Sequence, residues 1–192
     1  MDEYEKLLAE AQQNPGKCDF LALRMAYTRS PLFNPYLNTA NIPMALRQAV
    51  QQDDQNLIGA GLQRVLQEDY LDIETHIVAY NFYQQSGRTA KADYHGAFAR
   101  GLLASIMRVN GRTFETAFEV ISIREEYAVM GVLGLRVTMQ RKATHAGKNY
   151  DILTAKHPQT GEDLDFYFNI DRMRSYWNIS RAAKEDLPTP RQ

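Results

Sequence analysis

Three side chains in the first half of the sequence have the types and spacing of a metal site or an acid–base pair. Asp72 and His76 are four residues apart, which places both on one face of a helix, and His95 follows near the start of the next predicted helix. If that helix folds back on the first, the two imidazoles can meet. Asp72 would then orient His76, as a carboxylate does when it is hydrogen-bonded to a histidine that binds a metal. The same spacing fits a hydrogen-bonded contact between helices or two surface histidines, and no HExxH motif favours metal binding.

A second polar set lies near the end of the chain. Residues 164–171 alternate strictly between apolar and polar types, which is typical of a half-buried antiparallel strand. The apolar face would hold Leu164, Phe166, Phe168 and Ile170, and the polar face would hold Asp165, Tyr167, Asn169 and Asp171. With Asp151 across the sheet, the polar face could bind a ligand or hold Ca²⁺ or Mg²⁺. A solvated outer face would have the same composition.

A basic and aromatic group near the N-terminus is the third candidate site. Arg24, Tyr27 and Tyr36 could line a pocket for a carboxylate-bearing ligand, because arginine offers a fork of donors and the rings offer flat walls. An ion pair between Arg24 and Asp19 would account for the arginine without any ligand.

Motifs that identify catalytic chemistry are missing from the sequence. It contains no G-x-S-x-G elbow, no G-x-x-x-x-G-K-[ST] phosphate loop and no G-x-G-x-x-G between a strand and a helix. Cys18 is the only cysteine, which excludes an internal disulfide and a multi-cysteine zinc site. No catalytic residue is therefore predicted, and no motif indicates a cofactor.

The first 110 residues carry the signals of the helices that must position these side chains. Asp2 with Glu5 resembles a capping box, and Asp19 can cap a second helix that runs to about Thr28. After a loop with three prolines, helical patterns cover 43–52, 55–69, 70–87 and 89–111. Their short connectors predict antiparallel neighbours in a tetratricopeptide-like array, although no 34-residue repeat fits cleanly.

Residues 111–177 are predicted to form a small antiparallel sheet with one packed helix. A strand is expected over 117–123, and Ser122 with Glu125 starts a helix that ends at Gly134. Further strands are predicted over 136–143, 150–156 and 164–171. The chain is therefore expected to be an α+β protein with a helical half, 1–110, a β-α-β-β-β half, 111–177, and a polar, frayed tail, 178–192.

Charge and hydropathy exclude several classes of partner. The 192 residues carry a formal net charge of −1, which provides no field to attract nucleic acid or an anionic membrane surface. No apolar stretch is long enough to cross a bilayer, and the N-terminus lacks a secretory signal. A cytoplasmic monomer or homodimer is expected, although the mature form of an exported protein would have the same features.

Three stretches are similar to an uncharacterised bacterial family that is known only as a domain of unknown function. These stretches are DFLALRMAYTRSPLFNPY (19–36), AFEVISIREEY (117–127) and NYDILTAKHPQTGEDLDFYFNID (149–171). The resemblance covers most of the chain and implies a shared fold. The family brings no activity, substrate or catalytic residue that could be transferred to these positions.

Two functional hypotheses from different classes follow. The first is a non-enzymatic module that binds a protein segment or a small ligand on the concave side of the helices or between the two halves. The alternative is a metal-assisted hydrolase with its site between the halves, in which Asp72, His76 and His95, or the 165–171 face, would position a metal or move a proton.

Overall fold

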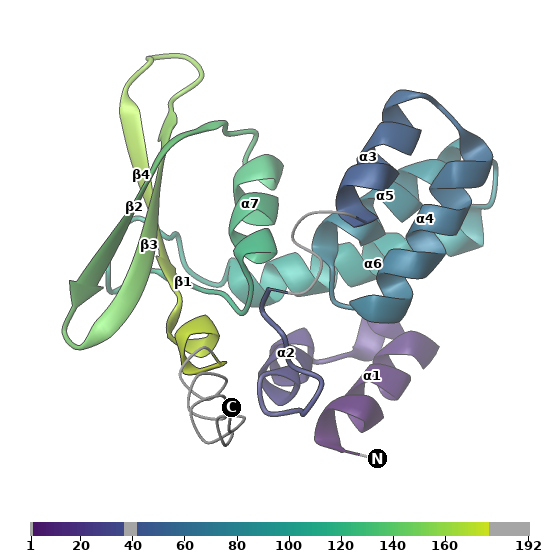
Figure 1. The fold of residues 1–192 in the computed structure, drawn as a ribbon, viewed down its shortest axis with the longest axis horizontal. Helices are drawn as coiled ribbons and strands as arrows, with labels where there is room; N and C mark the ends of the chain where they lie inside the picture. The colour runs from purple at the N-terminus through teal and green to yellow at the C-terminus, as the bar shows by residue number, and fades with distance from the viewer. Residues whose placement is uncertain (1, 37–41, 177–192) are drawn as a thin grey trace, which may run out of the picture.

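The computed structural model describes residues 2–36 and 42–176 and places the helices before the sheet (Figure 1). The helical half contains α1 (Glu3–Gln13), the 3₁₀ helix η1 (Pro15–Lys17), α2 (Phe20–Tyr27), α3 (Ile42–Gln51), α4 (Gln55–Glu68), α5 (Ile73–Gln85) and α6 (Thr89–Ile106). The sheet half contains β1 (Phe118–Glu119), α7 (Ile123–Val132), β2 (Val137–His145), β3 (Lys148–Lys156) and β4 (Asp163–Asn169). This order confirms the α+β class. The predicted tail, 178–192, lies outside the described residues.

Polar side chains fix where the helices begin. Asp2 and Glu5 form the predicted capping box, in which each side chain accepts a hydrogen bond of 2.8 Å from the other residue's backbone N–H. The Asp19 carboxylate accepts a bond of 2.9 Å from the N–H of Ala22 at the start of α2. Local sequence therefore determines the start of these helices.

The helices pack antiparallel in places, but the tetratricopeptide-like regularity is not confirmed. Helices α5 and α6 lie along each other, and α3 and α4 form a second pair beside them (Figure 1). Helix α2 has 8 residues and packs against α6, which has 18. Helices of such unequal length, with η1 inserted between the first two, do not form equivalent repeat units.

The sheet is mixed, whereas the sequence predicted an antiparallel one. Its strand order is β1-β4-β3-β2; the β2–β3 and β3–β4 pairs are antiparallel, and β1 runs parallel to β4. The chain leaves β1 through α7 and enters β2 at the opposite edge, so β1 is free to pair with β4. The strand predicted over 117–123 is only two residues long, because Ser122 caps α7.

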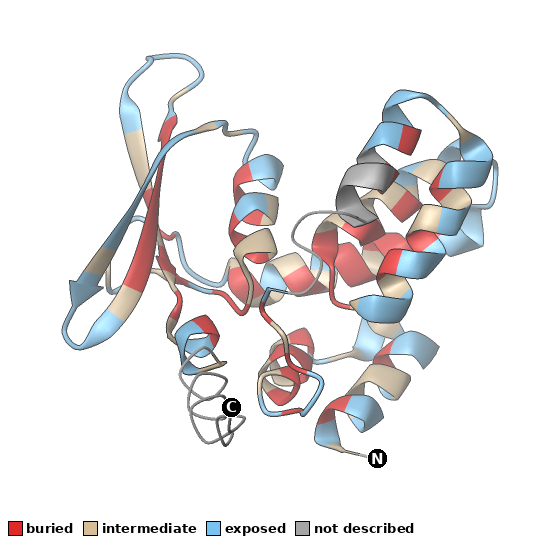
Figure 2. Ribbon diagram, viewed as in Figure 1, coloured by how far each residue is buried: buried red, intermediate tan, exposed pale blue. Residues whose placement is uncertain are grey.

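One hydrophobic core extends through both halves. Figure 2 shows buried residues along α2, α6, the inner side of α7 and the central strand β3. The same cluster of buried side chains contains Leu23 and Phe98 from the helical half and Val129, Leu153 and Phe168 from the sheet half. The boundary that the sequence predicted near residue 110 is therefore crossed by continuous apolar packing.

Strand register shows which side chains of β3 and β4 share a face. Asp151 lies opposite Phe168, and Leu153 lies opposite Phe166, so Asp151 is on the inner face beneath α7. The sequence had placed Asp151 with the polar face of β4. That assignment is wrong, because directly opposite residues of paired strands project to the same side of the sheet.

Candidate functional site

His76 of α5 and His95 of α6 meet in the interior of the helical half. Their Nδ1 atoms are 2.9 Å apart, and the side chains are 0% and 9% exposed. The Nε2 atom of His76 lies 2.9 Å from the main-chain carbonyl oxygen of Tyr70. The ring of Phe98 stacks on His76 at 4.7 Å. Antiparallel packing of α5 and α6 thus joins two residues that are 19 positions apart in the sequence.

The hydrogen bonds determine which ring nitrogens carry protons. A carbonyl oxygen only accepts, so Nε2 of His76 must donate to Tyr70, and Nδ1 of a neutral His76 is then an acceptor. Nδ1 of His95 must in turn donate to His76. Neutral His95 is left with a lone pair on Nε2.

Burial keeps both rings neutral. It lowers the pKa of His76 to about 3, against the opposing effect of the hydrogen bond with Tyr70. Burial also lowers the pKa of His95 to about 4, and the positive charge of Lys91 adds to this shift. At neutral pH each histidine therefore carries one ring proton, and the directions of the two hydrogen bonds are fixed.

The predicted metal set of Asp72, His76 and His95 does not converge. Both nitrogens of His76 are used, so this ring has no free lone pair for a cation. Asp72 does not orient His76, since its carboxylate pairs with Arg124 at 2.6 Å and accepts from the N–H of Thr75 at 2.7 Å. Within residues 2–36 and 42–176, no group of three or more histidine, cysteine or acidic side chains could hold a metal.

A cavity of about 860 Å³ lies next to His95. Its walls come from α1, the end of α2, α4, α5, α6 and the segments that join them. Most of the lining is aromatic, aliphatic or amide in character: Tyr4, Leu8, Gln12, Tyr27, Leu32, Gly59, Leu62, Gln63, Leu66, Gln67, Glu68, Tyr70, Tyr83 and His95. This volume and this composition are typical of small-molecule sites.

Aromatic contacts hold the wall around His95. The ring of Tyr83 stacks on the imidazole of His95 at 5.5 Å, with 17° between the planes. The hydroxyl oxygens of Tyr70 and Tyr94 are hydrogen-bonded at 2.7 Å. The rings of Tyr4 and Tyr27, which also line the cavity, lie 4.8 Å apart. These contacts give the cavity rigid, flat walls.

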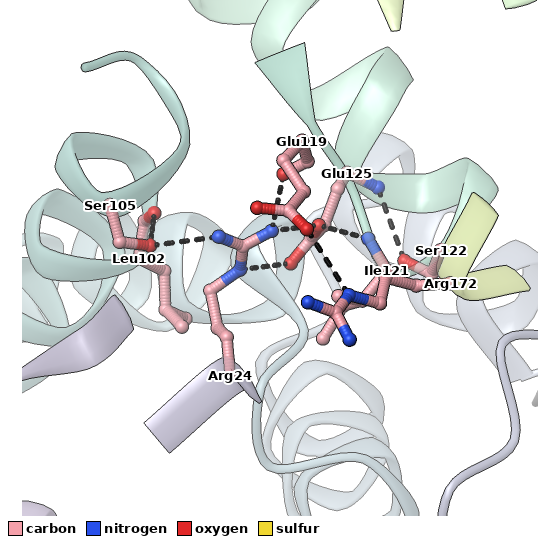
Figure 3. A network of polar contacts seen from close by, with 8 residues as sticks. All are labelled: Arg24, Leu102, Ser105, Glu119, Ile121, Ser122, Glu125 and Arg172. Carbon is pink, nitrogen blue, oxygen red and sulfur yellow. Dashed lines mark hydrogen bonds and ion pairs between the residues drawn. The ribbon is translucent and has the colours of Figure 1, made fainter. Parts of the chain in front are cut away.

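Arg24, Tyr27 and Tyr36 do not form the predicted pocket. Arg24 is fully buried and makes a two-point ion pair with Glu125, with distances of 2.8 Å from Nε to Oε1 and 2.6 Å from Nη2 to Oε2 (Figure 3). Its predicted partner was Asp19, which caps α2 instead. Tyr27 lines the cavity, and Tyr36 packs toward Tyr176, with 6.3 Å between their rings.

Figure 3 shows that Arg24 has further partners. Nη2 donates to the carbonyl oxygen of Glu119 at 2.9 Å, and Nη1 donates to the hydroxyl of Ser105 at 3.2 Å. Glu125 also accepts a bond of 2.8 Å from the N–H of Ile121. The guanidinium is thus occupied by groups from α6, β1 and α7, and its role is to join the two halves.

The polar face of β4 is divided among separate partners. Asp165 pairs with Arg141 at 2.6 Å, and Asp171 accepts from the side-chain amide of Asn149 at 2.8 Å. The ring of Tyr167 packs against Phe114, with 4.8 Å between centroids. Asn169 accepts from the N–H of Asp171 at 3.0 Å. Asp165, Tyr167 and Asn169 lie along β4 and Asp171 follows its end, so the four side chains do not converge on one point.

Glu126 is an unusual residue that the sequence did not single out as a site. It is 0% exposed, and neither carboxyl oxygen has a hydrogen-bond partner among the described residues. Burial, together with the negative charge of Asp151, raises the pKa of Glu126 to about 9. A signal was present in the sequence, because Glu126 precedes Val129 and Met130 by three and four residues on the apolar face of α7.

The fold and this site define an α+β protein with a neutral histidine pair beside an aromatic cavity. The chain belongs to the family described as Domain of unknown function (DUF4919), which matches residues 3–178 and confirms the resemblance to an uncharacterised family. No curated protein and no solved structure matches the chain. Within the described ranges, none of the helices has the length and apolar character needed to traverse a bilayer, and the cytoplasmic location stays a prediction.

Proposed function

We propose that this protein is a ligand-binding module and that its cavity takes an uncharged, largely apolar small molecule. The observation that carries the proposal is the cavity of about 860 Å³ beside His95, with tyrosine and leucine walls and a few polar groups. Cavities of this size and composition bind ligands by burying apolar surface, while the polar groups set orientation.

The charge of the lining favours a neutral ligand. Among the described residues that line the cavity, Glu68 is the only acidic side chain, none is a lysine or an arginine, and His95 is neutral. Glu68 itself lies 3.7 Å from Arg64. An anionic ligand would lose its hydration without gaining an opposite charge from these residues, and a cationic ligand would meet only a carboxylate that already lies near Arg64.

The amide and hydroxyl groups of the lining can still satisfy a ligand with some polar atoms. Gln12, Gln63 and Gln67 each offer donors and an acceptor, and they stand among leucines on α1 and α4. An apolar side chain of a protein segment could enter the same cavity. The metal-assisted hydrolase stays a prediction without support from the geometry of His76, whose nitrogens are both bonded within the protein.

The test uses 1-methylindole as a neutral aromatic probe, added to protein with ¹³C-labelled leucine methyl groups. Leu8, Leu62 and Leu66 line the cavity, whereas Leu153 is buried under α7. The expected result is a saturable shift of the cavity methyl resonances with no change at Leu153. Shifts spread evenly over the molecule, or no shifts at all, would refute binding in the cavity.

Two glycine substitutions provide a matched pair of variants. Gly59 of α4 lines the cavity, and Gly131 of α7 has no atom near an added Cβ. Both lie in helices, so replacement by leucine raises helix propensity in each. Gly59→Leu should fill part of the cavity and weaken probe binding at least fivefold, while Gly131→Leu should bind as wild type does. Equal binding by both variants would place the probe elsewhere.

A further inference from the structure

We infer that Nε2 of His95 is the recognition atom of the cavity and that it selects a neutral aromatic ligand carrying an N–H or O–H donor. The assignment rests on the proposed function, because it concerns a ligand in the same cavity. It deepens that function by naming the ligand class and the residue that sets specificity.

The first argument is the free lone pair of His95. Nδ1 donates to His76, so Nε2 of the neutral ring is an acceptor, and no described residue donates to it. The fully buried side-chain atoms that have no hydrogen-bond partner do not include Nε2 of His95. Part of the surface of this atom is therefore accessible. His95 lines the cavity, and we take Nε2, its unpaired acceptor, as the atom that a ligand there would meet.

The second argument is that this acceptor cannot adapt. A glutamine amide or a tyrosine hydroxyl can turn to donate or to accept, but Nε2 of His95 can only accept while the ring is neutral. The ring is held by its bond to His76, which is itself held by the carbonyl of Tyr70, and by the stacked ring of Tyr83. A ligand that covers Nε2 without donating to it would leave a buried acceptor unpaired.

The third argument concerns the shape of the ligand. Tyr83 lies nearly parallel to His95, and the rings of Tyr4, Tyr27 and Tyr70 form other parts of the wall. Flat aromatic surfaces pack best against a flat aromatic ligand, by stacking or by edge-to-face contact. A ring that carries its own N–H or O–H, as in indole or phenol, combines both requirements.

His76 is a positioning residue in this scheme. It does not line the cavity, but its acceptor Nδ1 determines that His95 donates from Nδ1 and accepts at Nε2. If His76 could donate from Nδ1, the proton of His95 would move to Nε2 and the preference would reverse. The low pKa of both rings supports the neutral arrangement.

The deciding experiment compares indole with 1-methylindole, which differ in whether the ring nitrogen carries a proton or a methyl group. The probes are titrated against the wild-type protein, and binding is followed by the cavity leucine methyl resonances. Loss of one hydrogen bond and burial of an unpaired acceptor predict about tenfold weaker binding of 1-methylindole. Phenol and anisole form a second pair with the same expected order.

The outcomes separate this inference from the proposed function. Equal affinities for indole and 1-methylindole, both in the cavity, would overturn the role of His95 while leaving a ligand-binding cavity. Failure of both probes to bind in the cavity would overturn the proposed function as well. Tighter binding of indole than of 1-methylindole, and of phenol than of anisole, would support the inference, provided that the variants below respond as expected.

A spectroscopic signature and two variants complete the test. Long-range ¹H–¹⁵N spectra should show Nε2 of His95 without a proton, and indole should move that ¹⁵N resonance upfield where 1-methylindole does not. His95→Phe keeps an aromatic ring without the acceptor and should remove the preference for indole. His145→Phe, at an exposed residue of β2, should retain it. A proton on Nε2 in the free protein would overturn the assignment without any variant.

Discussion

Arg24 of α2 and Glu125 of α7 form a buried ion pair between residues that are 101 positions apart in the sequence. The two parallel hydrogen bonds of 2.8 and 2.6 Å are the geometry in which a guanidinium binds a carboxylate best. The pair lies where the helical half meets β1 and α7, so it is part of the contact between the two halves.

Arg24→Met is expected to destabilise the protein by about 3–5 kcal/mol, because Glu125 would be left as a buried charge without its partner. Urea unfolding at pH 7 measures the change. Arg29→Met is the matched control, since Arg29 pairs with Glu3 on the surface and both side chains are more than half exposed. The control should lose about 1 kcal/mol or less. Similar losses in the two variants would contradict the role given to the buried pair.

Glu126→Gln is expected to stabilise the protein increasingly as pH rises. The pKa of Glu126 is raised from its ordinary value of 4.5 to about 9 in the folded state. As the pH rises, the unfolded chain therefore releases this proton before the folded protein does, and the stability of the wild type falls between about pH 4.5 and pH 9. Glutamine does not titrate. The stability difference between variant and wild type should therefore grow by about 3 kcal/mol from pH 5 to pH 7.5.

Chemical unfolding at several pH values measures the effect of Glu126. The control is Gly131→Ala on the same helix, which changes no titratable group and should therefore show a difference that is nearly constant with pH. A constant difference for Glu126→Gln as well would mean that Glu126 is ionised in the folded protein at neutral pH.

The histidine pair predicts a loss of stability on the acid side. Both folded-state pKa values lie below the ordinary value of 6.5, at about 3 for His76 and about 4 for His95. The unfolded chain therefore takes up protons first, and stability falls as pH drops from about 6.5 toward 4. The expected loss is about 2 kcal/mol per histidine between pH 7 and pH 5.

Replacing His95 tests the acid-side prediction. His95→Phe should lose less stability than wild type over the interval from pH 7 to pH 5, because one titrating ring has been removed. Gly131→Ala, which changes no titratable group, should lose as much stability as wild type over the same interval. An unchanged profile for His95→Phe would show that this ring does not titrate with a lowered pKa.

Gly101→Ala should destabilise the contact between α2 and α6. A Cβ at Gly101 would lie 2.1 Å from the ring carbon Cε2 of Phe20, whose buried ring cannot move aside easily. Overpacking of this kind costs about 1–3 kcal/mol. Gly131→Ala has open space around the new methyl group and should gain up to about 1 kcal/mol from helix propensity. Thermal unfolding of the two variants gives the comparison.

Features that depend on neighbours in the sequence could be predicted. The capping box of Asp2 and Glu5, the Asp19 cap and the alternating strand β4 all follow from interactions over two to four residues. The meeting of His76 and His95 was also within reach, because two helices with a short connector pack antiparallel. The caps and the alternation follow from local geometry alone, and the histidine contact needs in addition only the packing of two consecutive helices.

The candidate cavity could not be predicted as a unit. Tyr27 and His95 had been assigned to two different candidate sites, and both line the same space. Tyr4, Leu62 and Tyr83 gave no signal of a common role, because each fits its own helix equally well as a packing residue. A cavity is the volume left where several helices fail to fill a gap, and that depends on their relative positions.

By itself, the sequence determined the α+β class, most helix starts and the two faces of β4. Only the tertiary structure decided that Arg24 pairs with Glu125 and not with Asp19, that β1 runs parallel to β4, and that Asp151 lies beneath α7. The physical reason is distance along the chain. Caps and periodicity act within a few residues, whereas the partner of a buried polar group is chosen by the packing of elements that the sequence does not place side by side.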